Sequence, residues 1–273
     1  MQDRPLPGSR ALAVGLPRLL LNLLPTRLPR LPPTLLSLLP LLPLLPSSCA
    51  LCGVTANQAL CAACEQQFFH GHAQRCHCCA LPLASSAEVD SPICGACLRQ
   101  PPAYDASIVA ADYTAPLDQL VLALKFAGRL ALAPLFARLL RDAMLADRLQ
   151  QLPDLLIPVP LGRQRLAGRG FNQALEIGRS LSGLLGIRLA PALVVRQRET
   201  QAQSLLHPDQ RHRNMAGAFG ITQGAAAHLH GRHVGMVDDV MTTGATAHEL
   251  AATLKRHGAA KVSNLVFART LPK

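Results

Sequence analysis

The sequence contains no tryptophan and few other aromatic residues, with two tyrosines and seven phenylalanines in 273 residues. Proteins that stack a row of nucleobases need many exposed aromatic side chains, so this shortage argues against such a protein. Acidic residues are also scarce: 16 Asp and Glu stand against 27 Lys and Arg, and the formal charge at pH 7 is +11. Hydrophobic residues still make up 49% of the chain, which excludes disorder over its whole length. The length allows one large domain or two modest ones.

The first 46 residues lack any apolar stretch of membrane-spanning length that is free of proline, because ten of the 22 prolines fall there. A secretory signal also fits poorly, since the apolar stretch lies far from Met1 and ends in Ser47, Ser48 and Cys49. A transit peptide is a further alternative, but this proline density breaks the amphipathic helix that it needs. We expect residues 1–46 to be a Pro/Leu-rich disordered extension, or the product of translation begun upstream of the natural start. The protein is expected in the cytoplasm, without a membrane span.

All nine cysteines lie between Cys49 and Cys97, and eight of them form C-x-x-C units. One such turn places two thiolates for a tetrahedral metal, and two turns supply the four sulfurs of a structural zinc site. We therefore predict a double zinc ribbon over residues 47–100 with two structural zinc sites, paired in the order of the sequence. The predicted ligands are Cys49, Cys52, Cys61 and Cys64 for the first site, and Cys76, Cys79, Cys94 and Cys97 for the second.

Other interpretations of the cysteines remain open. Disulfides would need an export signal, which we do not find, and a redox C-x-x-C would need a thioredoxin-like setting. Cys78 is a ninth thiol and His72 and His77 are spare ligands, so the choice of ligands within CHCC stays open to replacement by any of the three. Zinc thiolate sites would also reduce the formal charge to about +7, which weakens any argument for nucleic-acid binding from charge alone.

From Pro101 onward the pattern predicts an α/β domain over residues 101–273. Apolar runs that suit strands alternate with amphipathic helices, which favours a parallel sheet flanked by helices, with ligands beyond the carboxyl ends of the strands. The expected strands are Ser107–Ala111, Leu155–Val159, Leu193–Val195, His233–Val237 and Val262–Ala268, and the expected helices are Pro116–Phe126, Leu130–Leu149, Asn172–Leu185 and Ala247–His257.

The stretch HVGMVDDVMTTGATAHEL is the most informative part of this domain. An apolar strand delivers Asp238 and Asp239, and a turn rich in threonine and glycine leads into a helix. Thr246 and Glu249 have the spacing of a capping box, which would start the helix there. Amides and hydroxyls at a helix N-terminus bind phosphate. The two carboxylates can accept hydrogen bonds from a ribose diol and help hold Mg2+. The alternative is a strand, turn and helix whose threonines only cap and whose acids are only solvated.

This string resembles the signature of the type I phosphoribosyltransferases, which bind 5-phosphoribosyl-1-pyrophosphate (PRPP). Together with the paired cysteines, the chain from Cys49 to Leu271 resembles the ComF family, which includes competence proteins. Three further pieces match in order: LKFAGR (residues 124–129), PVPLGRQRLAGRGFNQA (158–174), and RQRETQAQSL with RHRNMAGAF (196–219). The resemblance implies a type I phosphoribosyltransferase-like sheet behind a double zinc ribbon.

The resemblance also implies roles for individual residues. Asp238 and Asp239 would bind the ribose hydroxyls and, with Arg198, form the catalytic group. The phosphate and pyrophosphate ligands would be Thr242, Thr243, Gly244, Ala245, Thr246, Leu161, Gly162, Arg163, Arg165 and Lys125, with Pro160 in the pyrophosphate loop. The segment 196–214 resembles a loop that closes over PRPP, with Arg198, Thr200, Gln203, Arg211 and Asn214 as candidates, although its arginines equally suit a solvated basic face.

Three functions follow from the resemblance. The first is transfer of a phosphoribosyl group from PRPP, with Mg2+, to a nitrogen acceptor that the sequence does not identify. The second is a non-enzymatic accessory role in DNA uptake, with single-stranded DNA and DNA-uptake proteins as partners. The third is a regulator that binds PRPP without turnover. We find no arrangement of Ser, His and Asp or of Cys and His that suggests another chemistry.

Overall fold

The structure is a computed structural model that describes residues 47–69, 74–83, 92–147, 151–198 and 215–272. The predicted extension of residues 1–46 lies outside the described residues, and so do His72 and four loop candidates, Thr200, Gln203, Arg211 and Asn214. Within the described ranges, no helix is both long and apolar enough to cross a membrane.

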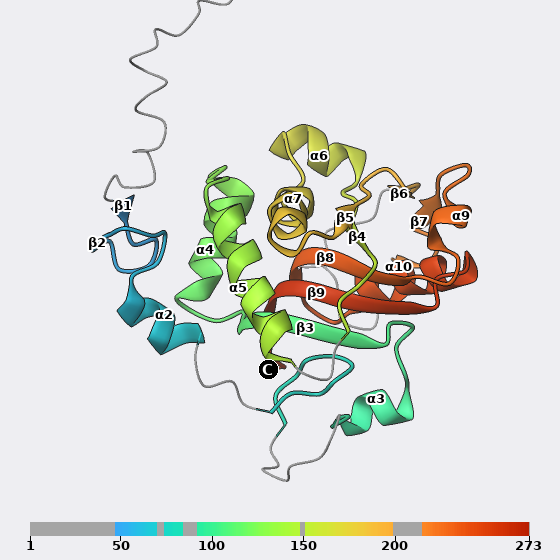
Figure 1. Cartoon of the computed structure of the whole chain (residues 1–273), viewed down its shortest axis with the longest axis horizontal. Coiled ribbons are helices and arrows are strands. Elements are labelled where there is room, and N and C mark those ends of the chain that lie inside the picture. Colours follow the sequence, from blue (N-terminus) through green and yellow to red (C-terminus); the bar gives the residue numbers. More distant parts are fainter. Residues whose placement is uncertain (1–46, 70–73, 84–91, 148–150, 199–214, 273) are drawn as a thin grey trace, which may run out of the picture. The chain divides into compact units, whose positions relative to one another are not determined.

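A parallel sheet of five strands lies at the centre of the C-terminal part of the chain (Figure 1). Its strand order is β3-β9-β8-β4-β5, and every neighbouring pair is parallel. The three long strands are buried along most of their length because both faces of the sheet are covered. The prediction of an α/β fold with a parallel sheet is confirmed. The strands are β3 (Ala106–Asp112), β4 (Leu155–Pro158), β5 (Arg188–Leu189), β8 (His233–Met241) and β9 (Lys261–Arg269).

Helices cover both faces of this sheet. Apolar side chains of α4, α5 and α7 form one core with the sheet, and those of α10 form a second core with the same strands. Within the first core, the ring of Phe136 on α5 stacks on that of Phe267 on β9, with centroids 3.6 Å apart. The helices are α4 (Leu117–Phe126), α5 (Leu132–Ala146), α6 (Arg163–Arg169), α7 (Gln173–Leu185), α9 (Ala226–Leu229) and α10 (Ala245–Arg256).

Two elements differ from their sequence-based predictions. The expected strand Leu193–Val195 exists as β6 (Val194–Arg196), but it pairs antiparallel with β7 (Phe219–Ile221) and stays outside the main sheet. Strand β8 does not end before the two aspartates, because it continues through them and remains paired with β9 as far as Met241.

The cysteine-rich part contains little regular structure. It holds a two-stranded pair, β1 (Ser47–Ser48) and β2 (Thr55–Ala56), and two short helices, α2 (Ala62–Phe69) and α3 (Gly95–Arg99). Such a short segment cannot bury a large core of its own, which is the usual reason for metal sites in small domains.

The first half of this segment shares its apolar core with the α/β part. Cys64 and Phe69 are buried in the same cluster as α5 and the sheet, and the ring centroids of Phe69 and Phe267 are 6.4 Å apart. Arg138 on α5 donates two parallel hydrogen bonds to the carboxylate of Glu65 on α2, at 2.7 and 2.8 Å. This part of the ribbon is therefore packed into the fold.

The second half is joined to the sheet by polar contacts. Arg75 pairs with Asp112 at the end of β3, with 2.9 Å between Nη1 and Oδ1. The backbone N–H of Ser107 donates to the carbonyl of His77 at 2.9 Å. Arg269, only 5% exposed at the end of β9, donates from Nε to the carbonyl of Cys79 at 2.8 Å.

Candidate functional site

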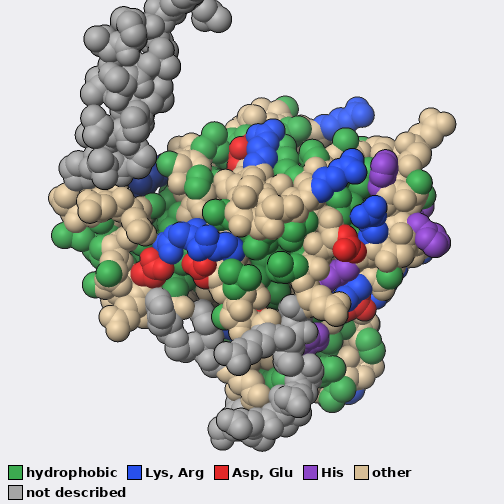
Figure 2. Space-filling model, viewed as in Figure 1, with side chains coloured by type: hydrophobic (Ala, Val, Ile, Leu, Met, Phe, Trp, Pro, Cys, Tyr) green, Lys and Arg blue, Asp and Glu red, His purple; other side chains and the backbone are tan. Residues whose placement is uncertain are grey.

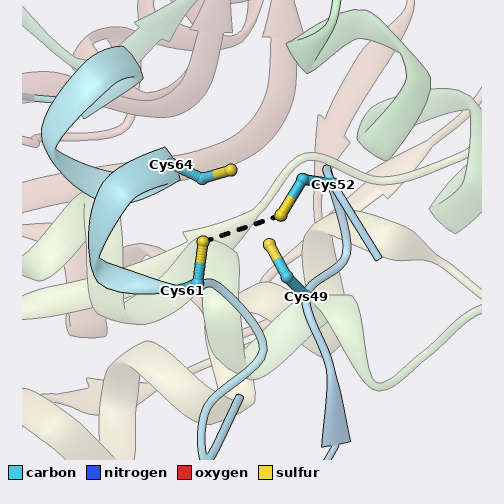
Figure 3. Close-up of side chains that lie close together, drawn as sticks. All are labelled: Cys49, Cys52, Cys61 and Cys64. Carbon is cyan, nitrogen blue, oxygen red and sulfur yellow. Dashed lines mark hydrogen bonds between the residues drawn. The ribbon is translucent and has the colours of Figure 1, made fainter. Parts of the chain in front are cut away.

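The first cysteine cluster brings together two turns of the chain (Figure 3). Cys49 and Cys52 come from the turn between β1 and β2, and Cys61 and Cys64 come from the start of α2, with their sulfurs directed toward one another. The four Sγ atoms lie within 4.8 Å of one another, and those of Cys52 and Cys61 are 3.7 Å apart. This pairing of neighbouring C-x-x-C units agrees with the predicted order.

The second cluster consists of Cys76, Cys79, Cys94 and Cys97, whose Sγ atoms also lie within 4.8 Å of one another. Cys79 and Cys94 are 3.7 Å apart at sulfur, and the backbone N–H of Cys94 donates to the sulfur of Cys76 at 3.2 Å. Cys78 lies outside the cluster, with its sulfur 3.9 Å from the carbonyl oxygen of Asp105. The open choice between the thiols of CHCC is thus resolved in favour of the C-x-x-C pair.

Both clusters fit zinc. A tetrahedral site with Zn–S bonds of about 2.3 Å separates its sulfurs by about 3.8 Å, close to the two distances above. None of the cysteines, all of which are described, forms a disulfide. Burial opposes ionisation of Cys49, yet backbone N–H groups led by that of Cys52 lower its pKa to about 6. Burial and neighbouring thiols raise the pKa of Cys64 to about 12. A bound cation would favour four thiolates.

A cleft with a volume of about 590 Å³ opens at the carboxyl ends of β4 and β8. This is where ligands bind in open parallel sheets. Eight of the sequence-predicted site residues line it: Lys125, Pro160, Leu161, Arg165, Asp238, Asp239, Thr242 and Thr246. The structure brings these residues together from three separate stretches of the chain.

The two aspartates of the cleft differ in their surroundings. Asp239 is 2% exposed and pairs with Lys125 on α4, with 2.6 Å between Oδ2 and Nζ. Gln173 at the start of α7 donates to its other oxygen at 3.4 Å, and the backbone N–H of Asp239 donates to Asp238 Oδ1 at 2.9 Å. Asp238 is half-buried and lines the cleft.

These contacts move the two pKa values in opposite directions. Burial opposes ionisation of Asp239, but the Lys125 ammonium and the hydrogen bonds hold its pKa below the ordinary value. Burial raises the pKa of Asp238 well above the ordinary value, and the neighbouring Asp239 raises it further. Asp239 is thus anchored as a carboxylate, whereas burial and the neighbouring carboxylate disfavour ionisation of Asp238.

The turn from β8 into α10 places backbone amides at one end of the cleft. Gly244 has φ +83°, and a Cβ atom built on it would lie 2.8 Å from the hydroxyl of Tyr104, so two independent constraints favour glycine here. Helix α10 begins at Ala245, and the N–H of Ala245 donates to Thr243 Oγ1 at 3.4 Å. The positive end of the helix dipole lies at this turn.

The predicted capping box of Thr246 and Glu249 is wrong. The N-cap is Gly244, so Thr246 lies in the first turn of the helix and has a side chain that lines the cleft. Glu249 instead accepts a hydrogen bond from the backbone N–H of Gly217 at 3.0 Å. The spacing was misleading because a glycine in the left-handed region can start a helix without a side-chain cap.

Three arginines line the cleft: Arg165 and Arg169 on α6, and Arg196 on β6. The guanidinium of Arg169 bonds to Gln173 Oε1 and lies over the ring of Phe126, 5.4 Å from its centroid. Sequence reasoning named Arg165 and missed Arg169, Gln173, Phe126 and Arg196. All four missed residues lie inside the three matching sequence pieces. These pieces could therefore have indicated the residues, although the sequence analysis gave none of the four a role.

The remaining predicted residues lie beside the cleft or away from it. Gly244 lines a small adjoining cavity of about 20 Å³ below the turn. Gly162 is the buried N-cap of α6, and Arg163 is exposed on the first turn of that helix. Arg198 is exposed and donates to the carbonyl of Ala216 at 2.6 Å. Among the described residues, these do not line the large cleft.

The buried Arg269 connects the cleft to the second cysteine cluster. Its Nε donates to Cys79, while its Nη1 lies 3.0 Å from the carbonyl oxygen of Met241 and also contacts that of Thr242. Arg269 therefore bonds both a cysteine turn and the first residue of the turn into α10.

Comparison with known proteins gives matches to both parts of the chain. Residues 41–98 match the family model described as Double zinc ribbon domain. The chain is 36% identical over 228 residues to the DNA utilization protein YhgH of Escherichia coli O6:H1, covering 82% of this chain and 90% of the relative. It is 32% identical over 222 residues to Competence protein F of Haemophilus influenzae, covering 78% of this chain and 92% of the relative.

Among solved structures, an adenine phosphoribosyltransferase from Thermoanaerobacter pseudethanolicus matches with 19% identity and a TM-score of 0.32, covering 53% of this chain and 83% of that one. The glutamine PRPP amidotransferase from B. subtilis matches with 16% identity and a TM-score of 0.29, covering 49% of this chain and 24% of that one. Likeness at this level does not identify a ligand or an activity.

Fold and site together define an α/β protein with a polar cleft at the strand ends and two four-cysteine metal sites. The sequence relationships are more specific, because they extend over most of both chains. The chain belongs to the ComF family.

Proposed function

We propose that the protein binds PRPP in the cleft at the carboxyl end of β8 and transfers its phosphoribosyl group to a nitrogen acceptor. The observation that carries the proposal is the placement of Asp238 and Asp239 directly before a turn that exposes helix amides, in one cleft with Lys125 and three arginines. PRPP presents a ribose diol, a 5-phosphate and a pyrophosphate, and the cleft offers carboxylates, a helix N-terminus and cationic side chains to bind them.

The residues divide the ligand between them. Amides and hydroxyls of the turn at 242–246 would bind the 5-phosphate, since a helix N-terminus favours an anion. Asp238 would accept hydrogen bonds from the ribose hydroxyls, while Lys125 and Gln173 hold Asp239 behind it. Arg165 would meet the pyrophosphate, because a guanidinium fork matches phosphate oxygens.

In the proposed reaction, the bond from C1 of the ribose to the pyrophosphate oxygen breaks, and the electron pair leaves with pyrophosphate. The acceptor nitrogen bonds to C1 and releases its proton to pyrophosphate or water. The protein orients the reactants and stabilises charge. Mg2+ bound with PRPP would neutralise pyrophosphate charge, and the carboxyl oxygens of Asp238 are suitable ligands for its hydration shell. We propose a cytoplasmic location, where free thiols persist.

Calorimetry with Mg2+ present tests binding, and release of pyrophosphate in the presence of candidate acceptors tests turnover. We expect PRPP and ribose 5-phosphate to bind, and Asp238→Asn to weaken binding of both. Asp142→Asn is the matched control, because Asp142 is an aspartate on α5 that pairs with Arg141 and does not line the cleft. If the folded, zinc-loaded protein binds neither ligand, the proposal is refuted.

A second candidate function is an accessory role with single-stranded DNA, and the observation that favours it is the pair of names carried by the relatives. Figure 2 shows basic side chains in separate groups on the face in view, several of them beside acidic ones, which is unlike a continuous track for a DNA backbone. Salt-dependent binding of a labelled oligonucleotide that survives Asp238→Asn would favour this role.

A further inference from the structure

A second cavity adjoins the cleft on the side of α4 and α6. Its volume is about 500 Å³, and it shares Lys125, Phe126, Arg165 and Arg169 with the cleft. The remaining wall consists of Ala127, Gly128, Gly168 and Phe171. A ligand in the second cavity would therefore be in contact with the same side chains as a ligand in the cleft.

Phe126 gives this cavity an aromatic surface. It is the last residue of α4, and it is 73% exposed although its neighbour Leu124 on the same helix is fully buried. The Arg169 guanidinium lies over the ring at 5.4 Å, and the large exposed fraction leaves aromatic surface for another planar group. Exposed phenylalanine at the junction of two cavities is suited to stacking a ligand ring.

The charge of the second cavity differs from that of the cleft. Among its described lining residues there are three cationic side chains and no acidic one, whereas the cleft also contains Asp238 and Asp239. Lys125 is already paired with Asp239. Arg165 and Arg169 contribute the other two positive charges, and a guanidinium favours a ligand with a carboxylate or similar anion.

We propose that the second cavity binds the acceptor, and that the acceptor is a planar nitrogen heterocycle carrying an anionic group. This inference rests on the proposed function, because an acceptor must lie beside the phosphoribosyl group to attack it. Its ring stacks on Phe126, its anionic group meets Arg169, and its ring nitrogen bonds to C1 as pyrophosphate leaves with the electron pair of the broken C–O bond. The nitrogen's proton passes to the released pyrophosphate.

A single strand of nucleic acid is a less suitable occupant. Strands that bind without sequence preference rely on successive aromatic side chains. Among the described lining residues of the two cavities, the aromatic ones are Tyr113, Phe126 and Phe171, and the whole chain has nine Tyr and Phe residues.

Binding to the cavity is measured directly by saturation-transfer NMR and calorimetry on the full chain, without PRPP. The probes are heteroaromatic carboxylates (orotate, nicotinate and imidazole-4-carboxylate) and their uncharged counterparts (uracil, nicotinamide and imidazole). We expect at least one carboxylate to bind about tenfold more tightly than its counterpart. Phe126→Leu, which keeps an apolar side chain but removes the ring, should weaken that binding about tenfold. Arg169→Gln should remove the preference for the anion.

Leu145→Ala is the matched control, because Leu145 is an exposed apolar residue on α5 that lines neither cavity. It should bind the probes as the unmodified chain does. PRPP binding measured in parallel should also be unchanged in Leu145→Ala. If the unmodified chain does not bind PRPP, the proposed function is refuted. Binding of the carboxylate probes would still show whether the second cavity is a binding site.

Several results would overturn the acceptor site itself. Equal binding of charged and uncharged probes, no binding of any carboxylate, or no effect of Phe126→Leu would each do so. An oligonucleotide that loses affinity in Phe126→Leu, with no carboxylate binding, would assign the cavity to DNA instead.

Discussion

The pair formed by Lys125 and Asp239 permits a sharp stability prediction. Replacing Lys125 by methionine keeps most of the stem volume but leaves Asp239, which is 2% exposed, without its cation. Removing one partner of a buried ion pair costs about 3–5 kcal/mol, and because the side chain of Lys125 is 20% exposed we expect about 3 kcal/mol. Urea unfolding of the zinc-loaded protein at pH 7 measures this loss.

The sign of the pH dependence follows from the pKa of Asp239. In the unmodified chain this pKa is lowered, so the pair stabilises the fold above the ordinary carboxyl pKa, and the stabilisation is lost only as the pH falls through the lower folded value. Lys125→Met removes the largest opposition to burial, so the pKa of Asp239 rises although the hydrogen bond from Gln173 remains. The penalty is then fully present at high pH and disappears as the pH falls toward the ordinary carboxyl value. The difference between the two proteins should therefore shrink from pH 7.5 to pH 5.5.

A double variant supplies the control. Lys125→Met combined with Asp239→Asn removes both charges, so it should be more stable at pH 7 than Lys125→Met alone. A single variant that loses less than about 1 kcal/mol, or a double variant that is less stable than the single one, would refute the view that Lys125 holds a buried carboxylate.

Three further outcomes are expected. Cys61→Ser should lower bound zinc from about two to about one per chain in a metal-dye assay, and two retained ions would contradict the first four-cysteine site. Gly244→Ala should cost about 1–2 kcal/mol of stability and weaken binding of ribose 5-phosphate. Adding Tyr104→Phe, which removes the crowding hydroxyl, should restore part of the stability. An unchanged free energy of unfolding in Gly244→Ala would contradict the crowding at this turn. Arg138→Ala should cost about 1 kcal/mol of stability by breaking its two hydrogen bonds to Glu65. Adding Glu65→Gln to Arg138→Ala should then cost little more. If the stability losses of the two single variants simply add in the double variant, the contact contributes nothing.

Local sequence patterns predicted strands and metal-binding turns well where a single physical requirement determines the residue types. The strands Ser107–Ala111 and Val262–Ala268 were predictable because strands covered on both faces are continuous apolar runs. The C-x-x-C pairs were predictable because metal chemistry requires that spacing. Strand β6 was located correctly in the sequence but placed in the wrong sheet, since pairing with β7 depends on a distant segment.

The site was only partly predictable for a similar reason. Asp238, Asp239 and the turn at 242–246 lie in one stretch, so their proximity follows from the sequence alone. Lys125 was proposed from the resemblance, but its contact with Asp239 arises from packing of α4 against the sheet. Phe126, Arg169 and Gln173 needed the structure, because nothing in their local sequence indicates which cavity they reach.

Arg269 joins the cysteine-rich part to the cleft through its hydrogen bonds. A shortened protein that begins after Gln100 would strip the carbonyl of Cys79 from a guanidinium that is 5% exposed. The Nε–H of Arg269 would lose its acceptor, and the same guanidinium bonds the carbonyls of Met241 and Thr242. We therefore expect the position of the turn into α10 to change. One buried side chain thus joins the turn at Cys79 to the residues that lead into α10.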